Sequence, residues 1–471
     1  MIFERDTNLL TTQPATNAGP SRFSRGLTLS TLVALVMLSA IDKLVFAFAG
    51  PALFRDLELT PIEFGLAGSA FFLPYAVAGV AVGILADRVQ TRWILAAMSL
   101  VWLTAQCMMA FAEELGTVIA SRLLLGAGTG PTTAVAQHAG FKWTRPQDRV
   151  MVSGLNHATL VAGGVVAATT LPFVVQQWGW RPAYFGLAAL SALWLSVWLP
   201  FAREGTEDRE AGGHGRHGAK DLPAPLPSYR KLMLNRTFVA ITIIGFVGYV
   251  PNVIGFSWLM VYLQQGLRLT PATMASYLTL VAIGMIVASV LAMVASRRAL
   301  QQGASIRRAM VWPPMVACAI GGCAYTSLWL TSDHVPVRLA LYALGATGVS
   351  LLPQYAFAIV GHIAGQSRRG AMLAIHNGLV TSAGIVGPVL IGVVIEAADG
   401  NVVSGLSQFF HGYGVLAILA AFAGLWTIRP EQTAAAISAS SAVGNISGTS
   451  SGADPPLVRS VKADRPSRTM A

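Results

Sequence analysis

Two oppositely charged residues, Asp42 and Lys43, lie side by side in an apolar stretch that runs from Leu27 to Phe48 and carries no other charge. The stretch is long enough to cross a bilayer as a helix. A charged residue at the centre of a membrane helix costs about 2.5 to 3.5 kcal/mol on insertion scales, so such residues usually face a polar cavity or pair with one another. We therefore expect this pair to form the functional core of a transporter.

A third charged residue, Arg122, falls within another apolar stretch. At about 1.5 Å per residue, Asp42 should lie roughly 6 Å outward of the centre of its span and Arg122 roughly 9 Å outward of its own, so the two could meet. One acid with two bases leaves an excess positive charge, which suits a substrate with one carboxylate; arginine offers it a bidentate fork and lysine a compact charge. The alternative is a structural Asp42–Arg122 pair that joins two helices and leaves Lys43 unpaired.

Uncharged polar residues near the predicted midplane could complete a substrate cavity by stacking and hydrogen bonding. They are Tyr75, Tyr249, Asn252, Gln354 and Tyr355. Each could equally be ordinary packing between helices.

Histidines occur in the predicted cytoplasmic halves of several spans, and a histidine titrates near neutrality and could relay protons. His157 and His376 are therefore proton-coupling candidates beside Asp42, although an interhelical hydrogen bond is the plainer role for each. No Ser/His/Asp set, metal-ligand spacing or phosphate loop stands out. We expect no enzyme activity, no cofactor and no metal.

The elements that would position these residues are membrane helices. Only 11% of the residues are charged, 54% are hydrophobic and the mean hydropathy is +0.59, unlike an ordinary soluble domain. A span needs roughly 20 mostly apolar residues. Twelve such segments are predicted, at 27–48, 64–86, 93–112, 118–140, 151–174, 182–201, 238–262, 271–295, 309–331, 337–361, 371–397 and 407–428.

The basic residues predict the orientation, because cytoplasmic flanks retain Lys and Arg. The chain has 32 Lys and Arg residues, of which Lys43 and Arg122 fall within spans. With both termini in the cytoplasm, only four of the others fall on the outer side of the membrane, namely Arg55, Arg181, Arg268 and Arg338. This topology accounts for the basic pI of about 9.9, so we expect no nucleic-acid partner. A multi-pass protein of a bacterial inner membrane, acting as a monomer, is predicted.

Two long polar stretches divide the chain. A Gly- and Pro-rich charged segment separates the sixth and seventh spans, and the end of the chain is rich in Ser, Ala and Gly. Such compositions favour linkers and disorder. The predicted organisation is a cytoplasmic segment at 1–25, a six-helix half at 26–202, a cytoplasmic linker at 203–236, a second six-helix half at 237–428 and a disordered cytoplasmic tail at 429–471.

The two halves resemble repeats of each other. Leu57-Glu-Leu-Thr-Pro61 recurs as Leu267-Arg-Leu-Thr-Pro271, an offset that also maps Asp42 onto Asn252. Parallel repeats of six helices are the plan of the major facilitator fold, with substrate sites between the halves near the midplane. An all-α membrane protein of twelve helices in two halves is therefore predicted.

The loop after the second span carries a family resemblance. Gly83-Ile-Leu-Ala-Asp87-Arg88-Val-Gln-Thr-Arg92 resembles the signature of the major facilitator superfamily. Asp87 is then expected to cap or pair across helix ends, with Arg88 and Arg92 holding an inner gate. The bland alternative is a solvated basic loop.

Finer motifs resemble the anion:cation symporter branch of that superfamily. They are Ala49-Gly-Pro-Ala-Leu53, Ser69-Ala-Phe-Phe72, Arg122-Leu-Leu-Leu-Gly126 with Gly130-Pro131, Trp178-Gly-Trp-Arg181 and Trp258 with Tyr262. Members of this branch typically carry small organic anions, often with protons. The chain departs from the branch in having Lys43 where an arginine is usual, Val45 for an asparagine, and Thr129 for a glutamate linked to proton coupling. Asp42 is then the only carboxylate deep in any span.

The predicted function is import of a small organic carboxylate, aromatic or short and aliphatic, with protons and by alternating access. One alternative is a proton-coupled exporter of drugs or metabolites, although the fifth span has Gly163-Gly164 without the proline typical of such antiporters. A polytopic sensor or enzyme is the alternative of another class.

Overall fold

The computed structural model describes residues 22–86, 89–144, 149–202, 228–331 and 334–437, and this part of the chain is helical throughout. The first half comprises α1 (Arg22–Asp56), α2 (Pro61–Leu85), α3 (Thr91–Ala110), α4 (Leu115–Thr129), α5 (Thr132–Phe141), α6 (Arg149–Trp178) and α7 (Trp180–Phe201). After α9 (Tyr229–Met233), the second half comprises α10 (Arg236–Gly255), α11 (Leu259–Val261), α12 (Pro271–Gln301), α13 (Trp312–Ser327), α14 (Val335–Thr381), α15 (Ala383–Glu396) and α16 (Val402–Thr427). Short π-helical turns at Tyr262–Gly266 and Arg307–Val311 precede α12 and α13, and a 3-10 turn at Leu328–Leu330 follows α13.

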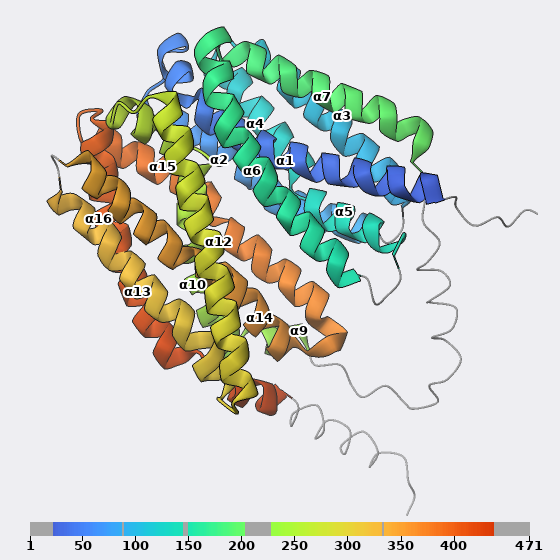
Figure 1. Cartoon of the computed structure of the whole chain (residues 1–471), viewed down its shortest axis with the longest axis vertical. Helices are drawn as coiled ribbons and strands as arrows, with labels where there is room; N and C mark the ends of the chain where they lie inside the picture. Colours follow the sequence, from blue (N-terminus) through green and yellow to red (C-terminus); the bar gives the residue numbers. More distant parts are fainter. Residues whose placement is uncertain (1–21, 87–88, 145–148, 203–227, 332–333, 438–471) are drawn as a thin grey trace, which may run out of the picture.

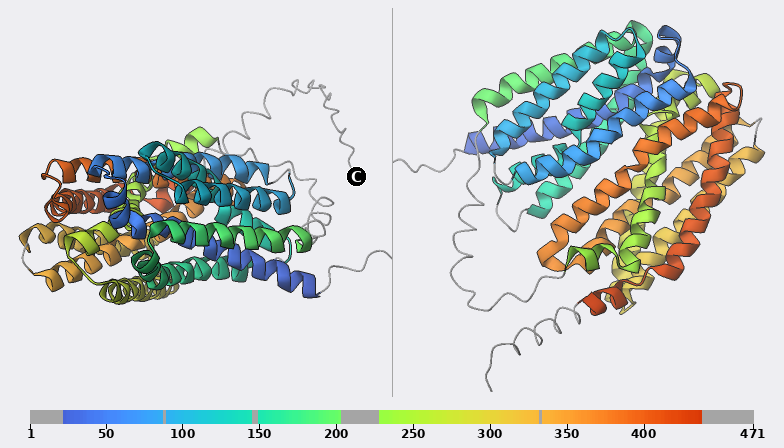
Figure 2. Two further views of the ribbon diagram at one scale, coloured as in Figure 1. Left: turned by 90° about the horizontal axis from the view of Figure 1, so that it is seen from above. Right: turned by 180° about the vertical axis from the view of Figure 1, so that it is seen from behind.

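The helices form two bundles, which correspond to the two halves of the chain (Figure 1). The bundles converge at one end and diverge at the other, where the chain enters α1 and leaves α7 (Figures 1 and 2). We call the diverging end the linker end and the converging end the closed end. α2 packs on α15, α6 on α12, and α1 on α11 across the boundary between the bundles.

Eleven of the described helical segments are long and apolar enough to cross a membrane. The remaining predicted span, the fourth, is divided at Gly130 and Pro131 into α4 and α5. A Cβ at Gly126 would lie 1.9 Å from the carbonyl oxygen of Phe71, and one at Gly130 would lie 2.1 Å from that of Tyr75. Small residues four apart permit this backbone-to-backbone approach between membrane helices. The split span completes the predicted twelve.

The tenth span and the start of the eleventh both belong to α14, within which the chain reverses direction. Two glycines less than one turn apart on α10 show this. A Cβ at Gly248 would touch Leu352, and a Cβ at Gly245 would lie 3.4 Å from the ring of His376. A straight helix would separate Leu352 from His376 by about 36 Å at 1.5 Å per residue. The two contacts therefore require a turn between these residues.

The repeated Leu-x-Leu-Thr-Pro sequence has the same conformation in both halves. Glu58 and Arg268 both adopt positive φ, at 48° and 55°. Thr60 and Glu63 exchange hydrogen bonds at the start of α2, and the side chain of Thr270 accepts a hydrogen bond from the backbone of Thr273 at the start of α12. These are helix caps, and they support the interpretation of the two halves as repeats.

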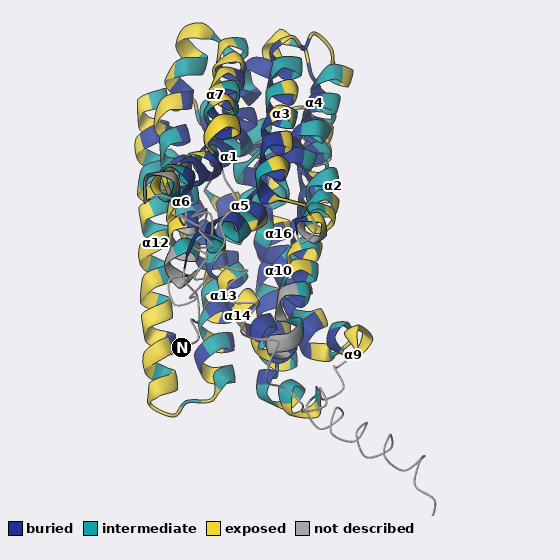
Figure 3. Ribbon diagram, turned by 90° about the vertical axis from the view of Figure 1, so that its right-hand side faces the viewer, coloured by how far each residue is buried: buried dark blue, intermediate teal, exposed yellow. Residues whose placement is uncertain are grey.

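Apolar side chains cover the surface that would face lipid. α12 is the most exposed long helix, since only 6% of its most apolar stretch is buried inside the protein. Figure 3 shows its exposed surface running along most of its length. Among its exposed residues are Leu280, Leu291 and Met293. Lipid tails can cover such a face at no cost, which explains why the helix needs few protein neighbours.

Two details differ from the sequence predictions. Residues 430–437 are helical and Thr433 hydrogen-bonds Thr237 at 2.6 Å, so the tail predicted to be disordered from residue 429 begins with an ordered segment. The predicted linker contains α9. Arg338, predicted on the outer side at the start of the tenth span, is 2% exposed and donates to the hydroxyl groups of Tyr262 and Ser407.

The closed end is sealed by close backbone contacts and by aromatic rings. A Cβ at Gly65 would lie 2.5 Å from the carbonyl oxygen of Pro388, and one at Gly392 would lie 2.4 Å from that of Pro61. The Trp258 ring packs 4.9 Å from Phe64 and 5.8 Å from Phe54, centroid to centroid. The two halves therefore touch across α2, α15 and the segment after α10.

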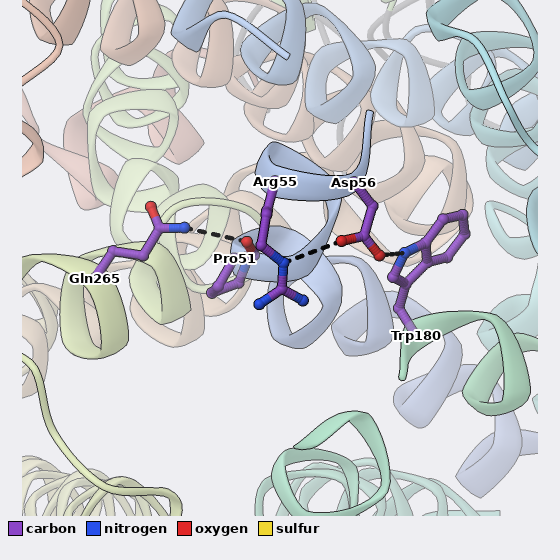
Figure 4. A network of polar contacts seen from close by, with 5 residues as sticks. All are labelled: Pro51, Arg55, Asp56, Trp180 and Gln265. Carbon is purple, nitrogen blue, oxygen red and sulfur yellow. Dashed lines mark hydrogen bonds and ion pairs between the residues drawn. The ribbon is translucent and has the colours of Figure 1, made fainter. Parts of the chain in front are cut away.

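A polar network adds to this seal (Figure 4). Gln265 of the second half donates to the carbonyl oxygen of Pro51 in the first half at 3.1 Å. Next to it, Asp56 accepts hydrogen bonds from Arg55 at 3.1 Å and from Trp180 at 3.0 Å. The Gln265 contact must break if this end opens.

We expect Gly65→Ala to disfavour the arrangement in which the closed end is sealed. The added methyl would meet the backbone of α15, and overpacking costs roughly 1–3 kcal/mol, which shifts the ratio of two states by about 5- to 150-fold. Spin labels at exposed Glu113 and Ala397 would report a longer distance across this end. Gly378→Ala is the matched control, since a Cβ at Gly378 meets nothing within 4 Å. Identical distance distributions in the two variants would contradict the prediction.

Candidate functional site

Asp42 of α1 is fully buried, and its Oδ1 accepts a hydrogen bond of 2.7 Å from Gln106 Nε2 of α3. Its Oδ2 has no hydrogen-bond partner. Sequence analysis missed Gln106, although a lone amide inside an apolar span is a signal, because polar groups there are costly. Only the tertiary structure, which brings Gln106 of α3 within hydrogen-bond distance of α1, shows that this amide belongs to Asp42.

Arg122 of α4 is enclosed between two aromatic rings. Its Cζ lies 4.3 Å from the ring centroid of Phe46 and 4.7 Å from that of Phe71, distances at which a cation is attracted to the π face. Its Nε donates to the carbonyl oxygen of Ala67 at 3.4 Å, and its Nη1 has no partner. Phe46 follows Asp42 by one helical turn, so α1 supplies one of the rings that cover the guanidinium.

Asp42 forms an ion pair with neither Arg122 nor Lys43. Within the described ranges, Arg55 and Asp56 form the only ion pair. Residue spacing predicts how far along their helices Asp42 and Arg122 lie, but it carries no information on the direction in which each side chain leaves its helix. In this conformation Arg122 is closed off from the boundary between the halves.

The interior of the first bundle contains several polar atoms that lack partners. They come from four helices and are Asp42 Oδ2, Gln106 Oε1, Arg122 Nη1 and Tyr184 Oη. Tyr184 of α7 is buried, 1% exposed. Buried polar atoms without partners are rare and call for an explanation. This polar cluster can form new hydrogen bonds when the helices around it shift.

Lys43 faces away from Asp42 toward α2, and its Nζ lies 5.5 Å from the ring centroid of Tyr75. Phe72 stands next to Tyr75 and also contacts Tyr249 of α10 and Phe256, which directly follows α10, at 6.4 and 6.3 Å between centroids. Two predicted site residues, Tyr75 and Tyr249, thus belong to one aromatic cluster that spans both halves. Lys43 is half-buried at its edge, with no carboxylate partner among the described residues.

A cavity of about 380 Å³ lies between the halves beside this cluster. Its walls come from α1, α6, α10, α12 and α14, and are mostly apolar, with Leu44, Phe48, Phe256 and Met285 among them. The polar side chains of Asn252, Thr279 and Ser350 also face it. Of the residues predicted to bind substrate, only Asn252 lines this cavity.

Two other predicted site residues join helices within the second half. Gln354 donates to the hydroxyl of Ser289 at 2.8 Å, and the hydroxyl of Tyr355 hydrogen-bonds that of Ser296 at 2.7 Å. Both contacts run from α14 to α12. Their partners on the neighbouring helix, Ser289 and Ser296, could not be identified from the sequence.

His376 is buried, and its Nδ1 lies 3.0 Å from the hydroxyl of Thr242 on α10. The rings of Phe238 and Phe357 pack against it. This is the interhelical hydrogen bond that was the plainer reading of its role. The side chain of His157 lies outside the described residues.

Little of the loop motif falls within the described part of the chain. Asp87 and Arg88 lie outside it, as do the surroundings of Gly83. Arg92 donates to the carbonyl oxygen of Leu199, and its own carbonyl accepts from Trp198 Nε1 at 2.9 Å. Arg92 therefore fastens the start of α3 to the end of α7.

Comparison with known proteins places this architecture in a family. The sequence profile of the Major Facilitator Superfamily matches residues 32–332, and the chain belongs to that superfamily. It is a family of transporters, not of enzymes. The fold agrees: a bacterial homologue of the lysosomal transporter Spinster, in an inward-facing unoccupied conformation, superposes with a TM-score of 0.70 at 17% identity over 88% of this chain and 99% of the other. A D-xylose-proton symporter gives a TM-score of 0.68 at 16% identity, over 88% of this chain and 99% of the symporter.

Relatives in sequence are anion transporters. The "Probable sulfoacetate transporter SauU" of Cupriavidus necator is 24% identical over 409 residues, which cover 84% of this chain and 93% of the relative. The "Hexuronate transporter" of Bacillus subtilis is 22% identical over 403 residues, which cover 84% and 92%. The anions in these names differ in size and polarity. The similarity therefore supports an anion as substrate without specifying which one.

Proposed function

We propose that the protein imports a small organic carboxylate together with protons, by alternating access between its two halves. The observation that carries this proposal is the position of Lys43. Its ammonium group lies beside the aromatic cluster that spans both halves and has no carboxylate partner among the described residues, and the next residue, Leu44, lines the cavity. A half-buried charge is costly unless it is paired, so an anionic substrate would relieve that cost.

The shape and lining of the cavity support a substrate with an apolar body. At about 380 Å³ it is within the usual range for small-ligand sites, and Leu44, Phe48 and Phe256 line it. Aromatic faces stack on flat or branched apolar groups. A monocarboxylate with an aromatic or short aliphatic body would place its charge near Lys43 and its body against this wall, with Asn252 as a hydrogen-bond partner.

In the proposed topology, both termini and the linker are cytoplasmic, in the inner membrane of a bacterium. The linker end is then the cytoplasmic end, where the halves diverge (Figure 1). The conformation would be inward-facing, with the contacts of Gly65, Trp258 and Gln265 closing the outer end. The transporter is proposed to act as a monomer.

Proton coupling is assigned to Asp42. It is buried, has one neutral hydrogen-bond donor and forms no ion pair in this conformation, which suits a carboxyl group that exchanges a proton during the cycle. Asp42 pairs with neither base in this conformation; in another state of the cycle, a charged Asp42 that approached Lys43 or Arg122 would compete with substrate for that base, and protonation would end the competition. Substrate and proton would then favour each other's binding by reciprocal linkage.

The decisive test is uptake by proteoliposomes containing the purified full-length chain. A panel of aromatic, short aliphatic and hydroxylated carboxylates, with sulfoacetate and a hexuronate included, is offered with and without an inward proton gradient. We expect saturable uptake of an apolar monocarboxylate that a pH gradient accelerates. Uptake confined to sulfonates or hexuronates would overturn the substrate class, and gradient-independent accumulation would overturn proton coupling.

The topology makes a prediction of its own. Cysteines introduced at Gly212 and Ser450, in a background in which Cys107, Cys318 and Cys323 are replaced, should resist membrane-impermeant maleimide in intact cells. The strong asymmetry of Lys and Arg requires both positions to be cytoplasmic. A cysteine at exposed Glu113, at the opposite end of the first half, serves as the labelled control. Ready labelling at either cytoplasmic position would refute the proposed orientation.

A further inference from the structure

A second pocket, separate from the cavity between the halves, lies at the linker end of the second bundle. It has a volume of about 490 Å³ and forms where α9, the start of α10, the end of α16 and the ordered part of the tail meet. The lining includes Asn235, Thr237, Thr427, Gln432 and Thr433. These side chains all carry groups that can donate hydrogen bonds.

The pocket is strongly cationic. Lys231, Arg236 and Arg429 line it, and its lining contains no Asp or Glu. None of the three pairs with a carboxylate in the described part of the chain. Arg429 Nε is buried without a hydrogen-bond partner, whereas the nearby Glu431 is engaged elsewhere, accepting from the backbone of Arg307 at 3.1 Å. A buried guanidinium nitrogen without an acceptor is the environment that an anion would complete.

The walls of the pocket are held in place by polar contacts. Asn235 caps α10 by accepting from the backbone of Phe238 at 2.8 Å. Thr237 accepts from the backbone of Arg429 at 3.3 Å and hydrogen-bonds Thr433 at 2.6 Å. The start of α10, with its partial positive charge, therefore borders the three cationic side chains. Lys231 and Arg236 stand at the exposed edge of the pocket, and Arg429 is partly buried in its wall.

The pocket lies at the level where lipid headgroups are expected. The apolar spans Arg236–Gly255 and Val402–Thr427 begin and end at it. Trp426 and Leu234, beside it in the chain, are 72% and 68% exposed, and aromatic side chains mark the boundary between hydrocarbon and water. Ala436 and Ile437 give the pocket an apolar side.

We propose that this pocket binds the phosphate group of an anionic membrane phospholipid, of the phosphatidylglycerol class. Three cations and the amide of Gln432 match a phosphate oxyanion, whereas the Asn235 amide and the Thr427 hydroxyl already donate to backbone carbonyls. Basic pockets between membrane helices are suited to anionic headgroups. Free inorganic phosphate offers the same chemistry. The position at the end of two spans, with an apolar side for the glycerol and acyl carbons, favours the lipid.

The test is native mass spectrometry of the full-length chain in detergent, titrated with phosphatidylglycerol, phosphatidylcholine or inorganic phosphate. We expect saturable binding of one phosphatidylglycerol at low concentration, at least about tenfold tighter than that of phosphatidylcholine. Lys231→Gln, Arg236→Gln and Arg429→Gln should each weaken it about tenfold, the effect of losing one charge-assisted hydrogen bond. Arg230→Gln is the matched control, since Arg230 neighbours Lys231 on α9 but does not line the pocket.

Each outcome has one meaning. Weaker lipid binding in the three pocket variants but not in Arg230→Gln supports the site. If Arg429→Gln does not fold, Lys231→Gln still tests the site, because Lys231 is exposed and its replacement should not disturb folding. Equal effects of all four variants, or equal binding of both lipids, would overturn it. Competition by inorganic phosphate alone, without lipid binding, would overturn the lipid assignment. The transport proposal does not depend on these results.

Discussion

Asp42→Asn is expected to abolish accumulation of substrate while leaving substrate exchange intact. In a one-proton symport, a gradient of one pH unit can concentrate substrate about tenfold, because one pH unit is worth about 1.4 kcal/mol. The asparagine cannot carry the proton, so the internal and external concentrations should become equal. The measurement is uptake into proteoliposomes under an imposed pH gradient, compared with counterflow between preloaded vesicles.

The structure explains why this variant should fold. The asparagine oxygen can still accept the hydrogen bond from Gln106, and its amide replaces an oxygen that has no partner. Asp399→Asn makes the same chemical change at an exposed position with positive φ, which asparagine tolerates well. If Asp42→Asn still concentrates substrate in response to the gradient, Asp42 is not the coupling residue, and His157 and His376 become the candidates to test.

Lys43→Gln should produce the largest loss of substrate affinity of any single change. The variant removes the cation assigned to the substrate carboxylate, and a hydrogen bond to a charged group is worth roughly 1.5–3 kcal/mol, or about 10- to 150-fold in affinity. Because Lys43 makes no ion pair in the described structure, thermal stability should change little. Lys43→Arg should be much milder, since it keeps the charge. The measurement is substrate binding, together with the midpoint of thermal unfolding.

Arg122→Lys should fail differently, by loss of stability as well as of transport. The planar guanidinium lies between Phe46 and Phe71 and donates to Ala67, and a lysine ammonium cannot reproduce a stacked, forked contact. If Lys43→Gln and Arg122→Lys both bind substrate as the wild type does, neither Lys43 nor Arg122 belongs to the site. A structural role would then account for Arg122.

The sequence determined the membrane architecture because each of its parts is a local property. A run of about 20 apolar residues suffices to define a span, and the excess of Lys and Arg at one set of loops predicts a topology. The sequence repeat at Leu57–Pro61 and Leu267–Pro271 specifies the same short turn in both halves. Glu58 and Arg268 accordingly both adopt positive φ. The superfamily followed from these features and from the loop motif.

The tertiary structure decided which polar side chains meet. In a membrane span nearly every position is apolar, whether it faces lipid or protein, so the pattern does not reveal how the helix is rotated. Residue spacing predicts depths for Asp42 and Arg122 but not their directions, and packing turned Asp42 to Gln106 and enclosed Arg122 in aromatic rings. Likewise, only the tertiary structure shows that Arg338 is buried and contacts Tyr262. Depth is set along one helix, whereas direction is set only when neighbouring helices pack.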